Sequence, residues 1–328
     1  MKALVTGANG FTGSYLTKHL LDKGYDVRVL VRKSSDMSVL EGLPIEYTYA
    51  NLADDTPIDH SVMDGIDVVY HIAALYRTEN VSKQLFWDVN VKGTQKLLEA
   101  AKIANVKRFV HCSTVGVQGE ISHPPAREED PYKPGDYYQE SKRDGEILAL
   151  DFFKREGLLG TVVRPVGIYG PGDLRFLKLF KYIYNGKFRM FGSGEVLYHL
   201  TFVEDLVAGI ALAGEKDAAI GEIITIGGNG YVTLSELVEK IATILDKKVS
   251  RLRFPVWPLW FAGLLCEVIC KPIGISPPIY RRRVDFFIKD RAFDISKAKR
   301  LLGYEPQVQL EQGLKITADW YKQEGLLT

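Results

Sequence analysis

The chain has 328 residues, 46% of them hydrophobic, and its 42 lysines and arginines nearly balance its 41 aspartates and glutamates. A chain of this length buries a large core, and its balanced charge argues against binding to nucleic acid. Its three cysteines have no Cys-x-x-Cys spacing, which argues against a disulfide framework and a zinc site. We therefore expect a cytoplasmic protein, without a metal ion, whose partner is a small-molecule substrate.

Residues 1–170 alternate short β-branched runs with longer helical patterns, which predicts a parallel sheet with crossover helices. The expected strands read KALVT, DVRVLV, IEYTY, DVVYHIA, RFVHCS and GTVVR, and the expected helices include residues 13–22, 84–104 and 137–155. A further apolar run, EIITIGG near Ile224, is expected to add a last strand. The fold class is therefore α/β with a doubly wound parallel sheet.

The second half of the chain contains segments richer in proline, aromatic and basic residues, as expected of a smaller lobe that covers a substrate. We expect residues 1–172 plus about 198–229 to form a nucleotide-binding domain. Residues of about 173–197 and 230–328 would then form a discontinuous C-terminal substrate-binding lobe.

The stretch TGANGFTG directly follows the first expected strand and opens the first expected helix. Gly7 permits a tight turn, Gly10 lets the backbone approach a pyrophosphate, and Gly13 allows close helix packing. The start of the helix offers free N–H groups to the anion. A plain strand-to-helix turn is the alternative, but the position favours dinucleotide binding in a Rossmann fold.

The end of the second strand reads VLVRKSSD. We expect the residues there to determine which of the two nicotinamide cofactors binds. An acidic residue there binds the adenosine ribose and would repel a 2′-phosphate. Arg32, Lys33 and Ser35 instead supply positive charge and a hydroxyl, and Asp36 comes too late. The pattern favours NADP(H), with NAD(H) as the alternative, unless this is only a solvated basic loop.

An apolar stretch, FPVWPLWFAGLLCEVIC at 254–270, needs weighing as a membrane element. It contains two prolines and Glu267 and is shorter than the ~20 residues that span a bilayer. We expect a helix that lines or covers a pocket, with weak membrane association as an interfacial anchor as the alternative. For Arg281 to Arg283 we expect a solvated face, although an acidic substrate group or a lipid headgroup is an alternative partner.

Several motifs follow one another at compatible spacing: TGANGFTG, NLADD, HIAA, DVNVKGT, HCSTVGVQG, YYQESK, RPVGIYGPGD, FVEDL and AFDISKAKRLLGYEP. Together they resemble the extended (atypical) short-chain dehydrogenase/reductase family, part of the NAD-dependent epimerase/dehydratase superfamily, over essentially the full length. Within it, the chain is most similar to the branch of 3β-hydroxysteroid dehydrogenases and dihydroflavonol-reductase-like enzymes.

The resemblance implies a set of site residues. Tyr138 and Lys142 match the family's catalytic dyad, and Thr114 matches its Ser/Thr, with Ser113 as the alternative in a shifted register. Asn90 matches an asparagine that organises the site backbone. Tyr76 and Tyr169 are expected in the substrate pocket. The residues expected to contact the cofactor are Gly7, Gly10, Phe11, Thr12, Gly13, Arg32, Lys33, Ser35, Asn51, Leu52, Ala73, Ala74, Tyr138, Lys142 and Pro165.

A Tyr-x-x-x-Lys spacing arises by chance roughly once in a chain of this make-up, so only its surroundings give it weight. At four residues' separation on a helix, Tyr138 and Lys142 share one face, whereas Tyr137 points elsewhere. A tyrosine has an ordinary pKa of about 10, so a nearby cation such as Lys142 is expected to favour the phenolate form of Tyr138. His71 is expected to be a packed side chain.

The combined pattern predicts an NADP-dependent oxidoreductase that transfers hydride between nicotinamide and a hydroxyl or ketone of a small, largely apolar molecule. A steroid-, flavonoid- or terpenoid-like substrate would fit, with Tyr138 as general acid and base. The alternative is a nucleotide-sugar 4-epimerase or dehydratase with tightly bound NAD. A redox-sensing dinucleotide-binding protein is less expected, because a sensor needs no general base. We expect a homodimer or a monomer.

Overall fold

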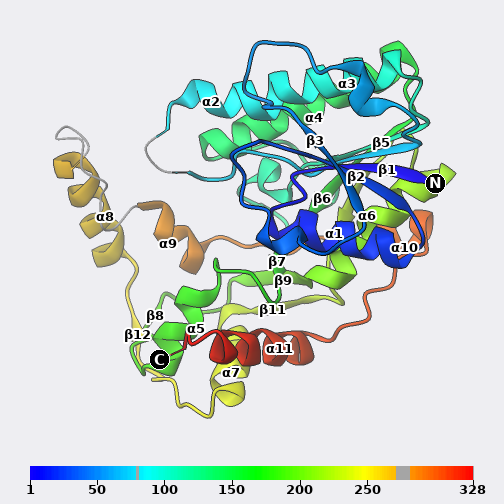
Figure 1. Ribbon diagram of the computed structural model, residues 1–328. Helices are drawn as coiled ribbons and strands as arrows, with labels where there is room; N and C mark the ends of the chain where they lie inside the picture. Colours follow the sequence, from blue (N-terminus) through cyan, green and yellow to red (C-terminus); the bar gives the residue numbers. More distant parts are fainter. Residues whose placement is uncertain (79–80, 271–280, 328) are drawn as a thin grey trace.

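The computed structural model describes residues 1–78, 81–270 and 281–327 (Figure 1). Its main layer is a parallel sheet of seven strands in the order β10-β6-β5-β4-β1-β2-β3. The strands are β1 (Lys2–Thr6), β2 (Asp26–Val31), β3 (Ile45–Tyr49), β4 (Val68–His71), β5 (Arg108–Cys112), β6 (Gly160–Pro165) and β10 (Ile223–Ile226). The strand order reverses between β1 and β4, which confirms the doubly wound Rossmann architecture and the late strand near Ile224.

Helices cover both faces of this sheet (Figure 1). They are α1 (Phe11–Asp22), α2 (Lys83–Trp87), α3 (Gly93–Ile103), α4 (Tyr137–Glu156), α6 (Val203–Glu215) and α10 (Ser296–Leu302). Successive side chains of β1 point to opposite faces, so Ala3 and Val5 pack with α1 and α6, whereas Leu4 packs with α3 and α4. Strands buried on both faces explain the nearly continuous apolar runs in the sequence.

A smaller lobe lies below the sheet in Figure 1 and has its own core. It contains a three-stranded sheet in the order β11-β9-β7 and a parallel pair of β8 with β12. Its elements are β7 (Gly167–Tyr169), α5 (Leu177–Tyr184), β8 (Met190–Phe191), β9 (Leu197–Phe202), β11 (Tyr231–Thr233), α7 (Leu234–Ile244), β12 (Arg253–Phe254), α8 (Trp257–Cys270), α9 (Arg281–Ile288) and α11 (Leu310–Gln323). Between β9 and β11 the chain returns to the large sheet through α6 and β10, so the two layers are interleaved in sequence.

Two elements lie across the domain boundaries expected from the sequence. β9, assigned to the nucleotide-binding part, pairs with β7 and β11 and packs in the core of the small lobe. α10, assigned to the lobe, packs against α6 and β10 of the large sheet. Within the described residues, no helix is long and apolar enough to cross a membrane.

A buried ion pair joins α4 to the large sheet. The Arg164 guanidinium on β6 donates to both carboxylate oxygens of Glu146 on α4, with Nη2 to Oε1 at 2.6 Å. Both side chains are almost inaccessible to solvent, at 1% and 0%. The Tyr132 hydroxyl also donates to Glu146, and Arg164 Nη1 donates to the carbonyl of Glu128. Every charge in this cluster is therefore hydrogen-bonded, as buried charges require.

We expect Glu146→Gln to lower the free energy of unfolding by about 3–5 kcal/mol, because it leaves the Arg164 charge buried without its counter-ion. Urea denaturation measures the loss. Asp319→Asn is the matched control, since it breaks an exposed pair with Lys315 on α11 and should cost less than about 1 kcal/mol. Equal losses in the two variants would contradict a structural role for the buried pair.

Candidate active site

A cavity of about 1130 Å³ lies where the carboxyl ends of the parallel strands face the small lobe. Thr6, Val31, Cys112 and Pro165, at the ends of β1, β2, β5 and β6, line it on the sheet side. Strand β9 and helix α9 contribute residues from the lobe side. Ligands of doubly wound sheets bind at this edge, beside the point where the strand order reverses.

The turn between β1 and α1 has the close packing expected from its glycines. Gly7 has a φ of +70°, and a Cβ there would lie 2.8 Å from the Cα of Ala73. A Cβ on Gly13 would lie 2.1 Å from the carbonyl oxygen of Gly7. Gly10 caps α1 without a side-chain hydrogen bond, and the first N–H groups of a helix have no partner within it. These groups fit the pyrophosphate of a dinucleotide.

Most residues predicted to contact the cofactor line this cavity. The predicted residues that line the cavity are Gly7, Gly10, Phe11, Thr12, Gly13, Arg32, Ser35, Asn51, Leu52, Ala73, Ala74, Tyr138, Lys142 and Pro165. Lys33 is exposed and is not part of the lining. Asp36 is also outside the lining, and its carboxylate accepts a hydrogen bond from the Ser38 N–H at 2.9 Å, which lowers its pKa. The charged side chain that lines the cavity just after the end of β2 is therefore that of Arg32, and not a carboxylate.

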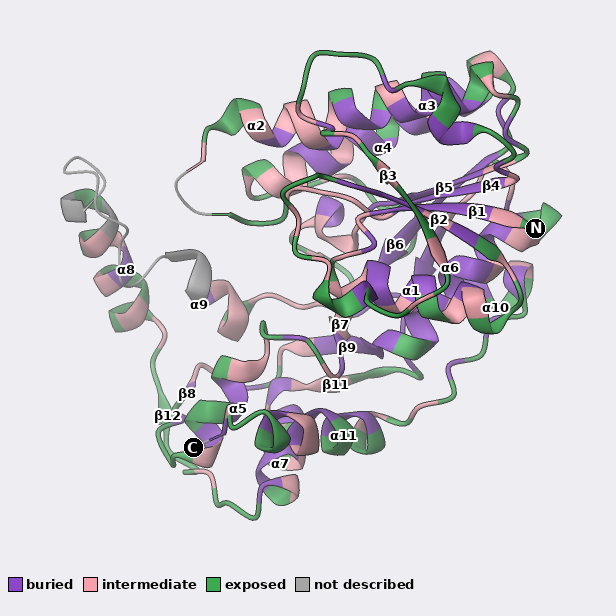
Figure 2. Ribbon diagram, in the orientation of Figure 1, coloured by how far each residue is buried: buried purple, intermediate pink, exposed green. Residues whose placement is uncertain are grey.

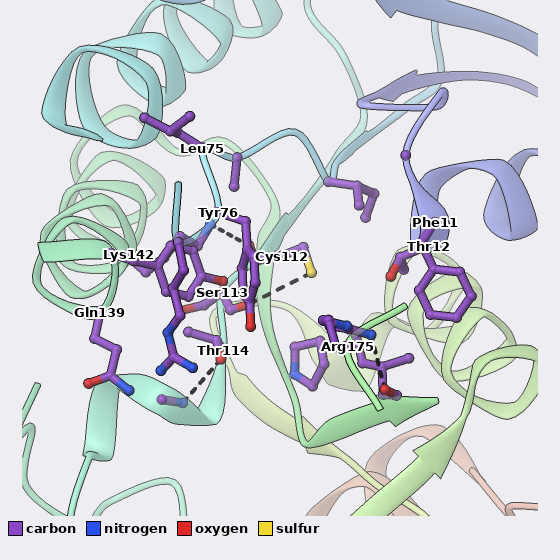
Figure 3. A pocket seen from close by; sticks show the side chains of 18 of the residues that line it. Phe11, Thr12, Leu75, Tyr76, Cys112, Ser113, Thr114, Gln139, Lys142 and Arg175 are labelled. Atoms are coloured by element: carbon purple, nitrogen blue, oxygen red, sulfur yellow. Dashed lines mark hydrogen bonds between the residues drawn. The ribbon is translucent and has the colours of Figure 1, made fainter. Parts of the chain in front are cut away.

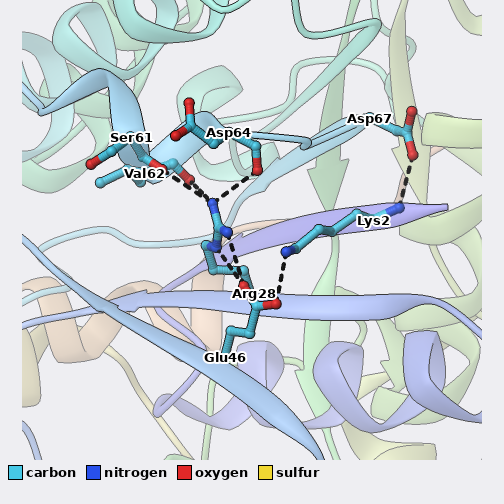
Figure 4. A network of polar contacts seen from close by, with 7 residues as sticks. All are labelled: Lys2, Arg28, Glu46, Ser61, Val62, Asp64 and Asp67. Atoms are coloured by element: carbon cyan, nitrogen blue, oxygen red, sulfur yellow. Dashed lines mark hydrogen bonds and ion pairs between the residues drawn. The ribbon is translucent and has the colours of Figure 1, made fainter.

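A polar network holds β1, β2 and β3 in register (Figure 4). The Glu46 carboxylate on β3 accepts hydrogen bonds from Lys2 on β1 and Arg28 on β2, at 2.7 and 2.9 Å, and these bonds lower its pKa. Arg28 also donates to three carbonyls of the segment before β4, those of Ser61, Val62 and Asp64. The network fixes the edge strand β3, whose end leads to Asn51 and Leu52.

Helix α4 presents Tyr138 and Lys142 to the cavity. Figure 3 shows the side chain of Lys142 among those that line it. Asp136 caps the helix by accepting from the N–H of Gln139 at 2.8 Å, which sets where the first turn begins. Tyr137 is 52% exposed, so the choice of Tyr138 as the inward tyrosine matches the geometry. The Lys142 ammonium is buried and donates to the carbonyl of Cys112 at 2.6 Å, and burial lowers its pKa.

Two arginines that the sequence did not single out stand beside Tyr138. Burial raises the pKa of Tyr138, whereas the positive charges of Arg77 and Arg175 lower it. The Arg77 guanidinium carbon lies 5.8 Å from the ring centroids of both Tyr76 and Tyr138, whose rings meet edge to face. Arg77 pairs with Asp136 at 3.1 Å. That Lys142 favours the phenolate stays a prediction.

Ser113 and Thr114 both line the cavity at the end of β5. The Thr114 hydroxyl accepts from the N–H of Gly116 at 3.1 Å, which leaves its own hydrogen available to a substrate oxygen. The Ser113 hydroxyl oxygen is fully buried and has no hydrogen-bond partner within the described residues. Thr114 is therefore the better placed of the two to reach a substrate, while Ser113 remains the alternative.

The model of the NAD dependent epimerase/dehydratase family matches residues 3–227. The chain belongs to this family. Sterol-4-alpha-carboxylate 3-dehydrogenase, decarboxylating, from Mus musculus is 29% identical over 96% of this chain and 90% of its own length. 3beta-hydroxysteroid-dehydrogenase/decarboxylase isoform 1 from Arabidopsis thaliana is 30% identical over 96% of this chain and 78% of its own length. UDP-glucuronic acid 4-epimerase from Bacillus cereus, solved with NAD, has a TM-score of 0.78 and 28% identity, with 99% of both chains covered.

These similarities confirm an enzyme of the extended short-chain dehydrogenase/reductase type, in the NAD(P)-dependent epimerase/dehydratase family. They also confirm the resemblance to the 3β-hydroxysteroid dehydrogenase branch. The solved epimerase binds NAD, and the preference of this family member for NADP stays a prediction.

Asn90 connects two parts of the site in this epimerase/dehydratase family member. Its side-chain amide exchanges two hydrogen bonds with the backbone of Leu75, at 2.8 and 3.2 Å, and donates to the Ser141 hydroxyl on α4 at 2.9 Å. It lies in a π-helical turn, Asp88–Lys92, which separates α2 from α3 where a single helix was expected. A Cβ at Gly145 would lie 2.4 Å from the Asn90 carbonyl oxygen, so this glycine allows α4 to approach.

Of the two tyrosines expected in the substrate pocket, only Tyr76 lines the cavity. Tyr169 is 2% exposed, and its ring packs edge to face on Phe202 in the core of the small lobe. The alternation of side chains along β7 explains the error, because Ile168 faces the cavity and Tyr169 faces the other way. His71 is buried and hydrogen-bonded to Thr6 and Thr94, and burial lowers its pKa to about 3.

Proposed function

We propose that this protein is an NADP-dependent oxidoreductase that transfers hydride between nicotinamide and a hydroxyl or ketone of a largely apolar small molecule. The observation that carries the proposal is the grouping of Tyr138, Thr114 and Lys142 in one cavity with the glycine turn of β1–α1. The names of the two relatives above, which are hydroxysteroid and sterol dehydrogenases, support a substrate with an apolar skeleton.

The lobe side of the cavity supports an apolar substrate. The apolar and aromatic residues that line it there are Phe176, Leu179, Tyr198, Leu200, Phe286 and Phe293. Binding sites for small molecules are mostly apolar, with a few polar groups that fix orientation. The polar groups Thr114 and Tyr138 lie on the sheet side, so an apolar body would rest on the aromatic and aliphatic part of the lobe wall while its oxygen faces the sheet. The lobe also contributes the polar residues His199, Asp285, Lys289 and Arg291 to the lining.

Different side chains of the protein have different roles in the proposed reaction. Tyr138 takes the proton of the substrate hydroxyl during oxidation and returns it during reduction. Thr114 donates a hydrogen bond that holds the substrate oxygen. Arg77 and Arg175 offset part of the rise that burial causes in the pKa of Tyr138. The bound nicotinamide supplies or accepts the hydride.

A nucleotide-sugar 4-epimerase or dehydratase is the second candidate, because the Bacillus cereus epimerase shares the fold over nearly the whole chain. Enzymes that return the hydride to the same substrate keep their cofactor bound. Native mass spectrometry of the freshly purified protein separates the candidates. The leading proposal predicts a protein that releases its cofactor and reduces ketones with NADPH, and firmly retained NAD would favour the epimerase.

We expect NADP to bind more tightly than NAD, and Arg32→Asp to reverse this preference by about tenfold or more, because the carboxylate would repel the 2′-phosphate. Fluorescence titration with each cofactor measures the ratio. Lys33→Asp is the matched control, since Lys33 lies next in sequence but does not line the cavity, and it should change the ratio much less. A preference for NAD in the wild type that Arg32→Asp leaves unchanged would refute the NADP assignment.

A further inference from the structure

Helix α8 exposes a row of large apolar side chains. Trp257, Phe261, Leu265 and Val268 are 71%, 52%, 48% and 61% exposed, and their spacing places them on one face of the helix. The helix packs against α9 and stands out from the rest of the molecule at the left edge of Figure 2. An exposed apolar surface of this kind marks an interaction site in a folded protein.

The length of α8 restricts what it can do at a membrane. Its 14 residues extend about 21 Å at 1.5 Å per residue, which is less than the ~30 Å of a bilayer's hydrocarbon core. The helix is therefore too short to span a bilayer, but it can lie in the plane of the bilayer surface.

The charges that flank α8 in sequence are positive. Lys247, Lys248, Arg251 and Arg253 precede it, all of them exposed, with no acidic residue among positions 247–253. α9, against which it packs, begins with three arginines, 281–283. Trp257 and Trp260 stand at the start of the helix, a few residues after Arg253 in the sequence. Tryptophans beside basic residues are typical of segments that lie at the surface of anionic membranes.

An aromatic row connects the base of α8 with the cavity. The ring of Phe254 lies 5.8 Å from that of Phe191, which lies 5.4 Å from that of Phe287. Phe287 in turn lies 5.1 Å from Phe286, which lines the cavity. These four phenylalanine rings thus form a continuous row of ring contacts from the base of α8 to the lobe wall of the active site.

We propose that the apolar face of α8 binds the surface of an anionic lipid bilayer, from which an apolar substrate reaches the cavity along the row of Phe254, Phe191, Phe287 and Phe286. The route of the substrate rests on the function proposed above, whereas the binding of α8 to lipid does not. A polar sugar nucleotide would need no such surface.

Sedimentation with vesicles tests the lipid contact in the absence of cofactor and substrate, so its outcome is independent of the enzymatic proposal. We expect the wild type to bind vesicles of phosphatidylcholine and phosphatidylserine more tightly than vesicles of phosphatidylcholine alone, and to be released by salt. The double variant Phe261→Glu with Leu265→Glu should lose at least about tenfold in affinity for the anionic vesicles. Both positions are exposed, and thermal unfolding checks that the fold is kept.

The matched control is Ile103→Glu with Leu159→Glu, which adds the same charges at exposed apolar positions away from α8 and should bind vesicles like the wild type. The proposal fails if the wild type does not sediment with anionic vesicles, or if both double variants bind equally. If the wild type does not bind vesicles but forms a dimer, and the α8 double variant is monomeric, the surface would instead bind a second copy of the chain. Ketone reduction in solution, measured separately, tests the enzymatic proposal.

Discussion

The site depends on one face of α4, on which Tyr138, Lys142 and Glu146 follow one another at intervals of one helical turn. Glu146 is tied to Arg164 on β6 by a fully buried ion pair, and Lys142 donates to the carbonyl at the end of β5. These two contacts fix the rotation and height of the helix against the sheet. Tyr138, one turn nearer the cavity, is thereby held at the edge where parallel strands bind ligands.

Opposing electrostatic effects meet at Tyr138. Burial favours the neutral phenol and raises its pKa, whereas the two guanidiniums of Arg77 and Arg175 favour the phenolate. Nearby, burial lowers the pKa of Lys142, and His71 and His111 beneath the site are held neutral because burial lowers their pKa values as well. The sheet side of the cavity thus places its few polar groups in an environment of low dielectric, where each interaction is strong.

The sequence predicted the features that depend on local patterns. The glycine turn, the doubly wound sheet and the inward tyrosine of YYQESK follow from spacing and periodicity, and the structure agrees with them. Arg77 and Arg175 escaped notice because only the tertiary fold brings the ends of two distant segments to Tyr138. Tyr169 was misplaced because the segment after RPVG forms a strand of the small sheet, and its side chains alternate between cavity and core.

The central claim, that Tyr138 is the general acid and base, is tested most directly by the pH dependence of kcat/KM for oxidation of an alcohol that the protein is shown to turn over. Oxidation requires the deprotonated tyrosine, so the wild-type rate should rise with pH, and burial shifts this rise toward alkaline pH. The account predicts that Tyr138→Phe loses this rise and is slower by a factor of about 100 or more, with cofactor binding retained. A variant that keeps both the rate and its rise with pH would contradict it.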